Sequence, residues 1–206
     1  MKSKILNHVF NSLFFFLGSL IFFSPLAIAC GKDFSPAGYW QTIDDKTNQP
    51  RSIVKICAND EKVFFGRIIQ VNYVDKENPK DTCEECDKND PRFNQQILGM
   101  TFLTNMKMNP INECMWDNGE VLDPKNGKVY HAQMLLSPNG QELTLRGYIG
   151  IPLFGRNQTW KRIPADSLNG ILGKPIKKYD SYIQTSLNKY LAFDYKSCII
   201  PQKKEV

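Results

Sequence analysis

Histidine is the scarcest chemically reactive residue in this sequence, with only two copies, His8 and His131. The sequence also contains no nucleophile-elbow motif, no glycine-rich phosphate loop and no cluster with metal-ligand spacing. We therefore expect no catalytic residue, no metal site and no cofactor, and we predict that the protein is not an enzyme. His131 lies alone on a predicted strand, and we interpret it as a surface side chain rather than a general base.

The charge imbalance of the chain is small. Lys and Arg number 26, against 21 Asp and Glu. Lys2 and Lys4 belong to an N-terminal segment that has no acidic residue, and without them the balance is 24 − 21 = +3. The remaining basic residues are scattered, apart from short groups near the C-terminus. A mild and dispersed positive charge does not favour nucleic acid as a partner.

Only one long apolar run is present, and it lies at the N-terminus. Leu13 to Phe23 follows the two early lysines and precedes Ala27-Ile28-Ala29, which has the form of a cleavage site. We predict that residues 1–29 are a signal peptide and that the protein is exported to the periplasm or secreted. Cys30 follows the cleavage site directly, so lipidation of this cysteine and membrane anchoring through it is the alternative. The leucine that usually stands three residues before a lipidated cysteine is replaced by Ala27.

Cysteines are few, but all six lie after the predicted cleavage site. They are Cys30, Cys57, Cys83, Cys86, Cys114 and Cys198. An oxidising compartment permits disulfides, and the sequence does not determine which cysteines pair. Cys83 and Cys86 have redox-motif spacing, but they lie in a polar loop among acidic residues that raise thiol pKa values. We interpret them as structural, with a metal ligand pair and a thiol-redox pair as alternatives.

The rest of the sequence alternates between short apolar segments and turn-forming residues. The eight segments predicted as strands are Tyr39 to Ile43, Arg51 to Ala58, Lys62 to Val71, Ile97 to Thr104, Glu113 to Leu122, Lys128 to Ser137, Gln141 to Gly150 and Asn157 to Ile163. The fifth segment is interrupted near Asn118-Gly119. The seventh places Leu143, Leu145 and Ile149 on one face.

Eight strands joined by short antiparallel turns favour an all-β fold that closes on itself. A meander of this size has unpaired edges unless it forms a barrel, and eight strands enclose room for side chains or one small ligand. We predict an eight-stranded antiparallel barrel over residues 30–163, with an open β-sandwich as the competitor. Residues 164–206 are predicted to form an extension with a short amphipathic helix around Tyr182 to Leu191.

The stretch from Leu143 to Ile163 is distinctive because it interleaves glycines, arginines and aromatic residues. Glycine in a strand marks a bulge, a bend or a close backbone approach. The polar side chains that we consider as ligand-binding candidates are Arg146, Tyr148 and Arg156, together with Tyr130 on the preceding strand. The alternative role for the two arginines is to neutralise carboxylates such as Glu120 and Asp123.

Several motifs together resemble one bacterial family. They are Gly38-x-Trp40, Arg51 to Ile56, Gly66-Arg67-Ile68, Ile97 to Met100, Gly119 to Pro124, Asn126-Gly127-Lys128-x-Tyr130, Leu145 to Gly150 and Phe154 to Arg162. This set is similar to the family called domain of unknown function 2147 and extends from about Gly38 to Arg162. The resemblance implies a short exported protein with a compact β fold, and it supplies no catalytic residue.

A weaker similarity is to the lipocalin fold. Lipocalins begin with Gly-x-Trp on the first strand and place an arginine from the last strand against that tryptophan. Trp40 and Arg162 occupy the corresponding positions here. Because a guanidinium over an indole ring is attractive and its N–H groups can bind nearby carbonyls, we predict that these two residues close the barrel.

Three functional hypotheses follow. The first is a binding module that holds a small apolar or amphipathic ligand inside the barrel. The second is an envelope-maintenance protein whose barrel is filled by aromatic side chains such as Phe64, Phe65, Phe102 and Trp160 and which acts through its surface. The third, which the sequence supports least, is a thiol-redox protein using Cys83 and Cys86.

Overall fold

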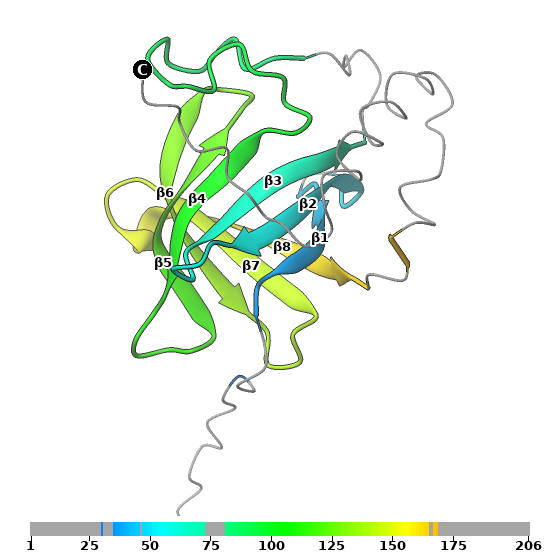
Figure 1. The fold of residues 1–206 in the computed structure, drawn as a ribbon, viewed down its shortest axis with the longest axis vertical. Helices are drawn as coiled ribbons and strands as arrows, with labels where there is room; N and C mark the ends of the chain where they lie inside the picture. Colours follow the sequence, from blue (N-terminus) through cyan, green and yellow to red (C-terminus); the bar gives the residue numbers. More distant parts are fainter. Residues whose placement is uncertain (1–29, 31–34, 46, 73–80, 165–166, 169–206) are drawn as a thin grey trace, which may run out of the picture.

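In the computed structural model, the described part of the chain forms a closed eight-stranded antiparallel barrel. The structure describes residues 30, 35–45, 47–72, 81–164 and 167–168. The elements are β1 (Gly38–Ile43), β2 (Pro50–Ala58), β3 (Phe64–Val71), β4 (Thr101–Met108), β5 (Met115–Asp123), β6 (Lys128–Leu136), β7 (Glu142–Tyr148), the 3₁₀ turn η1 (Pro152–Phe154) and β8 (Arg156–Ile163). Each strand pairs with the next, and β1 pairs with β8 (Figure 1), so the predicted barrel is confirmed.

The core lies inside the barrel because successive side chains of a strand point to opposite faces. Val54 and Ile56 on β2, and Leu143 and Leu145 on β7, show this period of two and are buried in one hydrophobic cluster. The same cluster contains side chains from every strand of the barrel. Closure leaves no sheet edge unpaired, which is the physical reason why a meander of this length forms a barrel.

Two asparagines with left-handed backbone conformation interrupt the regular pairing. Asn105 on β4 and Asn118 on β5 have φ angles of 60° and 58°. Asparagine tolerates this conformation better than most residues. The β5–β6 register shifts between Trp116 and Gly119, which is the interruption predicted near Asn118-Gly119. A side chain at Gly119 would overlap Met106 on the neighbouring strand, so the bulge requires glycine there.

The fourth strand begins later than the sequence indicated. The prediction was Ile97 to Thr104, whereas β4 is Thr101–Met108. The residues before it form a turn, in which the Met100 amide donates to the Ile97 carbonyl and Gly99 has a φ angle of 89°. Leu98 and Met100 are nevertheless buried. A buried apolar turn and a buried strand give the same composition, which explains the error.

Two further expectations concern the ends of the predicted elements. Leu143 and Leu145 are buried as expected, but Ile149 lies beyond the end of β7 and is exposed, so its assignment to their face was wrong. The predicted helix around Tyr182 to Leu191 lies outside the described residues. Within the described ranges, no helix is long and apolar enough to cross a bilayer.

Candidate functional site

One end of the barrel is closed by Trp40 and Arg162. The guanidinium carbon of Arg162 lies 4.2 Å from the centroid of the Trp40 ring. Arg162 also donates hydrogen bonds to the carbonyl oxygens of Gly140 (2.5 Å), Ala37 (2.9 Å) and Ser35 (2.7 Å). Burial lowers the pKa of this guanidinium from its usual value. The predicted pairing is therefore present, and it ties the segment before β1 to the β6–β7 turn.

The middle of the barrel is filled by a contact between opposite walls. Phe102 on β4 and Trp160 on β8 are four strands apart around an eight-stranded barrel, and their ring centroids are 6.1 Å apart. Nearer the closed end, Phe64 and Trp116 meet edge to face at 5.8 Å. All four rings belong to the buried cluster. The half of the barrel beside Trp40 is thus packed with side chains.

At the other end of the barrel, where β1 connects to β2, several inward-facing side chains are polar and most are only partly buried. They continue the alternation of core residues: Thr42 follows Trp40 by two, Ser52 precedes Val54 by two, and Gln158 precedes Trp160 by two. Together with three inward-facing residues of β5, β6 and β7 they form what we call the open-end set. Its members are Thr42, Ser52, Val121, Tyr130, Gly147 and Gln158. Thr42 is buried, whereas the other five are only partly buried.

The open-end set places hydrogen-bonding groups next to the aromatic rings of Phe102 and Trp160. The hydroxyl oxygens of Thr42 and Ser52 are 2.7 Å apart, and the Trp160 indole N–H points to Gln158 Oε1 at 3.4 Å. A Cβ atom at Gly147 would lie 3.4 Å from Val121 Cγ1 and 3.7 Å from Tyr130 Cβ, which places these three residues together. The set therefore offers hydroxyl, amide and phenol groups beside Phe102 and Trp160.

Of the four ligand-binding candidates from the sequence, only Tyr130 faces the barrel interior. Arg146 and Tyr148 flank the inward-facing Gly147, so they lie on the outer face of β7. Arg156 is exposed and forms an ion pair with Asp45 in the β1–β2 loop. The hydrogen bond between them lowers the pKa of Asp45 and raises that of Arg156. The carboxylate that Arg156 binds is thus Asp45 rather than Glu120 or Asp123.

An open pocket of about 440 Å³ lies on the outer surface of the barrel. It is lined by Asn105, Asn118, Gly119, Glu120, His131, Tyr148 and Gly150. Glu120, His131 and Tyr148 are opposite one another on β5, β6 and β7, and the His131 and Tyr148 rings are 5.5 Å apart. This pocket was not predictable from the sequence, because strand pairing determines where the two irregularities at Asn105 and Asn118 meet. In the described ranges, no group of three or more metal-ligating residues is present.

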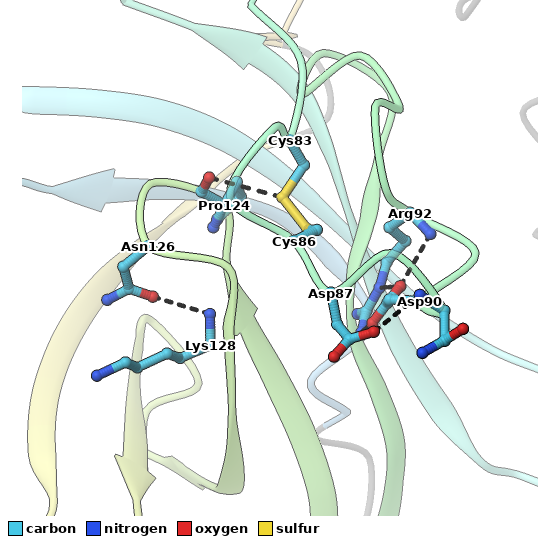
Figure 2. A network of polar contacts seen from close by, with 9 residues as sticks. Cys83, Cys86, Asp87, Asp90, Arg92, Pro124, Asn126 and Lys128 are labelled. Atoms are coloured by element: carbon cyan, nitrogen blue, oxygen red, sulfur yellow. Dashed lines mark hydrogen bonds and ion pairs between the residues drawn. A yellow bond between two sulfur atoms is a disulfide. The ribbon is translucent and has the colours of Figure 1, made fainter.

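The long connection between β3 and β4 packs onto the β5–β6 hairpin. Figure 2 shows the Cys83–Cys86 disulfide beside Pro124. The Cys83 sulfur lies 3.6 Å from the Pro124 carbonyl oxygen. Gly127, in the hairpin turn, lies so close to the backbone of Glu85 that a Cβ atom would overlap it. Cys83 and Cys86 are both buried. The pair therefore fixes a loop against the hairpin at the open end of the barrel.

A second disulfide joins Cys30 to Cys114 across 84 residues. A lipid thioether on Cys30 would need the same sulfur atom, so this disulfide and lipidation of Cys30 exclude each other. Cys57 also takes part in a disulfide. Cys198 lies outside the described residues.

Comparison with a solved structure agrees with this architecture. The chain is similar to protein HP1028 from the human pathogen Helicobacter pylori, which is described as belonging to the lipocalin family. The TM-score is 0.55 and the identity 20%, over 67% of this chain and 89% of that one. At this identity the similarity shows the fold alone.

Sequence comparison identifies the family. No curated protein matches the sequence. The model of one protein family matches residues 38–162, which is more than half of the chain and includes all eight strands apart from Ile163. The chain therefore belongs to the bacterial family described as "Uncharacterized protein conserved in bacteria (DUF2147)".

Proposed function

We propose that this protein is an exported binding protein that holds a small amphipathic molecule at the open end of its barrel. The observation that carries the proposal is the contrast between the two halves of the interior. Most apolar side chains that face inward beside Trp40 are buried, such as Val54, Ile56 and Leu143, whereas five of the six residues of the open-end set are only partly buried. A solid half supports the site and an accessible half receives the ligand.

The chemistry of the open-end set indicates the class of ligand. Phe102 and Trp160 offer an apolar aromatic surface, on which an alkyl or ring portion of a ligand can rest. Ser52, Tyr130 and Gln158 carry groups that both donate and accept hydrogen bonds, which suits a neutral or singly charged polar head. These groups suit binding rather than bond cleavage, so we propose a carrier or sensor and not an enzyme.

Export is part of the same proposal. It is supported by the N-terminal leader and by the disulfides at Cys30, Cys57 and Cys83, because structural disulfides persist in oxidising compartments. The bond between Cys30 and Cys114 favours a mature protein that is not lipidated. The alternative function is a surface-acting envelope protein with no ligand, and the fully packed half of the barrel is the observation that favours it.

A titration with a fluorescent fatty acid tests ligand binding. Dansylaminoundecanoic acid, excited through tryptophan, should show saturable energy transfer in the wild type because Trp160 lies beneath the open-end set. Gly147→Leu adds a side chain between Val121 and Tyr130, and we expect it to weaken binding at least tenfold. Thr144→Leu, on the outer face of the same strand, is the matched control and should bind as the wild type does. Equal binding by all three proteins would favour the surface-acting alternative.

A further inference from the structure

The connection between β7 and β8 exposes an unusual amount of apolar surface. Four large side chains occur within six residues: Ile149 is 68% exposed, Ile151 54%, Leu153 75% and Phe154 78%. We call residues Ile149 to Phe154 the apolar loop. Single exposed apolar residues are ordinary, but a contiguous group of this kind marks an interaction surface. In Figure 1 the loop, in yellow, projects from the left side of the barrel.

The apolar loop is held in place by Arg146 rather than left free. Arg146 donates from Nε to the Pro152 carbonyl oxygen (2.6 Å), from Nη2 to that of Leu153 (3.1 Å) and from Nη1 to Asn157 Oδ1 (2.6 Å). Gly155 permits this approach, because a Cβ atom there would lie 2.9 Å from Arg146 Nε. A guanidinium is therefore used to fix a turn whose side chains point into solvent. Such an arrangement lowers the entropy cost of placing those side chains in a partner.

We propose that the apolar loop inserts into the interfacial region of a lipid bilayer and docks the barrel on a membrane surface. The size of the patch favours a bilayer over a protein partner. Four side chains expose on the order of 500 Å², less than the roughly 800 Å² that each partner contributes to a standard protein interface. A bilayer needs no matching surface, and its affinity grows with each apolar group buried.

The charge of the hairpin fits the same partner. No acidic residue occurs between Leu143 and Ile163, so the apolar loop and β8 carry no carboxylate that would repel anionic lipid headgroups. Glu142, the first residue of β7, lies at the far end of that strand from the loop. Arg156 follows the loop directly, and its long side chain can remain at the headgroup level while the loop is buried. The ion pair with Asp45 anchors this residue to the β1–β2 loop.

Docking in this way would present the open end of the barrel to the lipid. In an up-and-down barrel the β1–β2, β3–β4, β5–β6 and β7–β8 connections lie at one end, so the apolar loop and the open-end set share that end. Membrane docking does not depend on the proposed ligand binding, because the open-end set lies inside the barrel and the loop lies outside it. The two can therefore fail separately.

Co-sedimentation with vesicles of phosphatidylethanolamine and phosphatidylglycerol tests the proposal on the full mature protein. We expect Leu153→Asp combined with Phe154→Asp to reduce the bound fraction at least tenfold without changing the thermal midpoint, because both side chains are exposed. Ile111→Asp is the matched control: Ile111 is 94% exposed in the β4–β5 connection at the opposite end, and its replacement should leave vesicle binding unchanged. Phe154→Trp should show a blue shift in fluorescence when vesicles are added.

Two further measurements test the proposal: vesicle binding at high ionic strength, and vesicle binding by a variant of Arg146. Binding through apolar insertion should persist at high ionic strength, where purely electrostatic adsorption is screened. Arg146→Ala should weaken vesicle binding while the apolar residues remain. Wild-type binding by the double aspartate variant, equal loss in Ile111→Asp, or no vesicle binding by the wild type would each overturn the proposal. Retention on a purified envelope protein in place of vesicles would do the same.

Discussion

Phe102 on β4 and Trp160 on β8 meet across the barrel with their ring centroids 6.1 Å apart, and this contact divides the interior. Toward Trp40 the space is packed with buried side chains, whereas toward the β1–β2 connection the inward-facing residues remain partly accessible. The same fold thus contains a packed base and a partly accessible end, where we propose that the ligand is held.

The closing contact at the base should depend on geometry more than on charge. Arg162→Lys keeps the positive charge but loses the planar fork that binds three carbonyl oxygens. We expect a loss of about 1–2 kcal/mol in the free energy of unfolding, from weakened cation–π and hydrogen-bond contacts. Denaturant unfolding measures it. Unchanged midpoints for both Arg162→Lys and Trp40→Phe would show that the contact does not stabilise the barrel.

The two described disulfides should differ in their contribution to stability. Cys30 and Cys114 are 84 residues apart, whereas Cys83 and Cys86 are 3 apart. In the loop-entropy model, removing the long-range bond by alanine substitution costs about 4–5 kcal/mol, and removing the short one costs about 2 kcal/mol. Unfolding of each double-alanine variant tests this order. The reverse order would show that Cys83–Cys86 acts mainly through its packing on Pro124.

The Cys83–Cys86 pair should also be chemically inert. Both cysteines are buried, and Glu84, Glu85 and Asp87 surround them with negative charge that disfavours a thiolate. Alkylation of the reduced protein across pH should show no thiolate well below neutral pH, and an insulin-reduction assay should show no turnover. A low thiol pKa together with turnover would make the redox hypothesis the leading one.

Glycine at the β5–β6 turn should be required for two separable reasons. Gly127 has a φ angle of 67°, and a Cβ atom there would overlap the Glu85 backbone. Gly150 has a similar φ angle of 73° but no neighbour within 4 Å. Gly150→Ala should therefore cost only the backbone strain of about 1 kcal/mol. Gly127→Ala should cost at least about 3 kcal/mol, because overpacking is added. Equal losses of unfolding free energy in the two variants would mean that the loop of residues 81–98 shifts to accommodate the new side chain at little cost.

Export can be checked by the intact mass of the protein from the envelope fraction. We expect residues Met1 to Ala29 to be absent and no diacylglycerol to be attached to Cys30, because its sulfur is bonded to Cys114. A mass that includes the leader, found in the cytoplasm, would contradict export. A diacylglycerol mass would show that the Cys30–Cys114 bond does not form in the mature protein.

Local sequence patterns predicted the barrel because strand periodicity and turn residues act over short distances. The pairing of Trp40 with Arg162 was predicted from the resemblance to lipocalins, and closure of the meander brings the two residues together by pairing β1 with β8. The role of Arg146 was not predictable, because binding the carbonyls of a loop requires no particular residue type in that loop. Of the open-end set, only Tyr130 was among the candidates from the sequence, because a single bulge reverses which side chains of a strand face inward.

The most direct test of ligand binding is native mass spectrometry of the protein purified from its own envelope, before and after organic extraction. We expect a discrete added mass on the wild type that extraction removes, and we expect this mass to be absent from Gly147→Leu purified in the same way. A wild-type protein that carries no added mass, together with failure to bind any amphipathic probe, would contradict the proposed function.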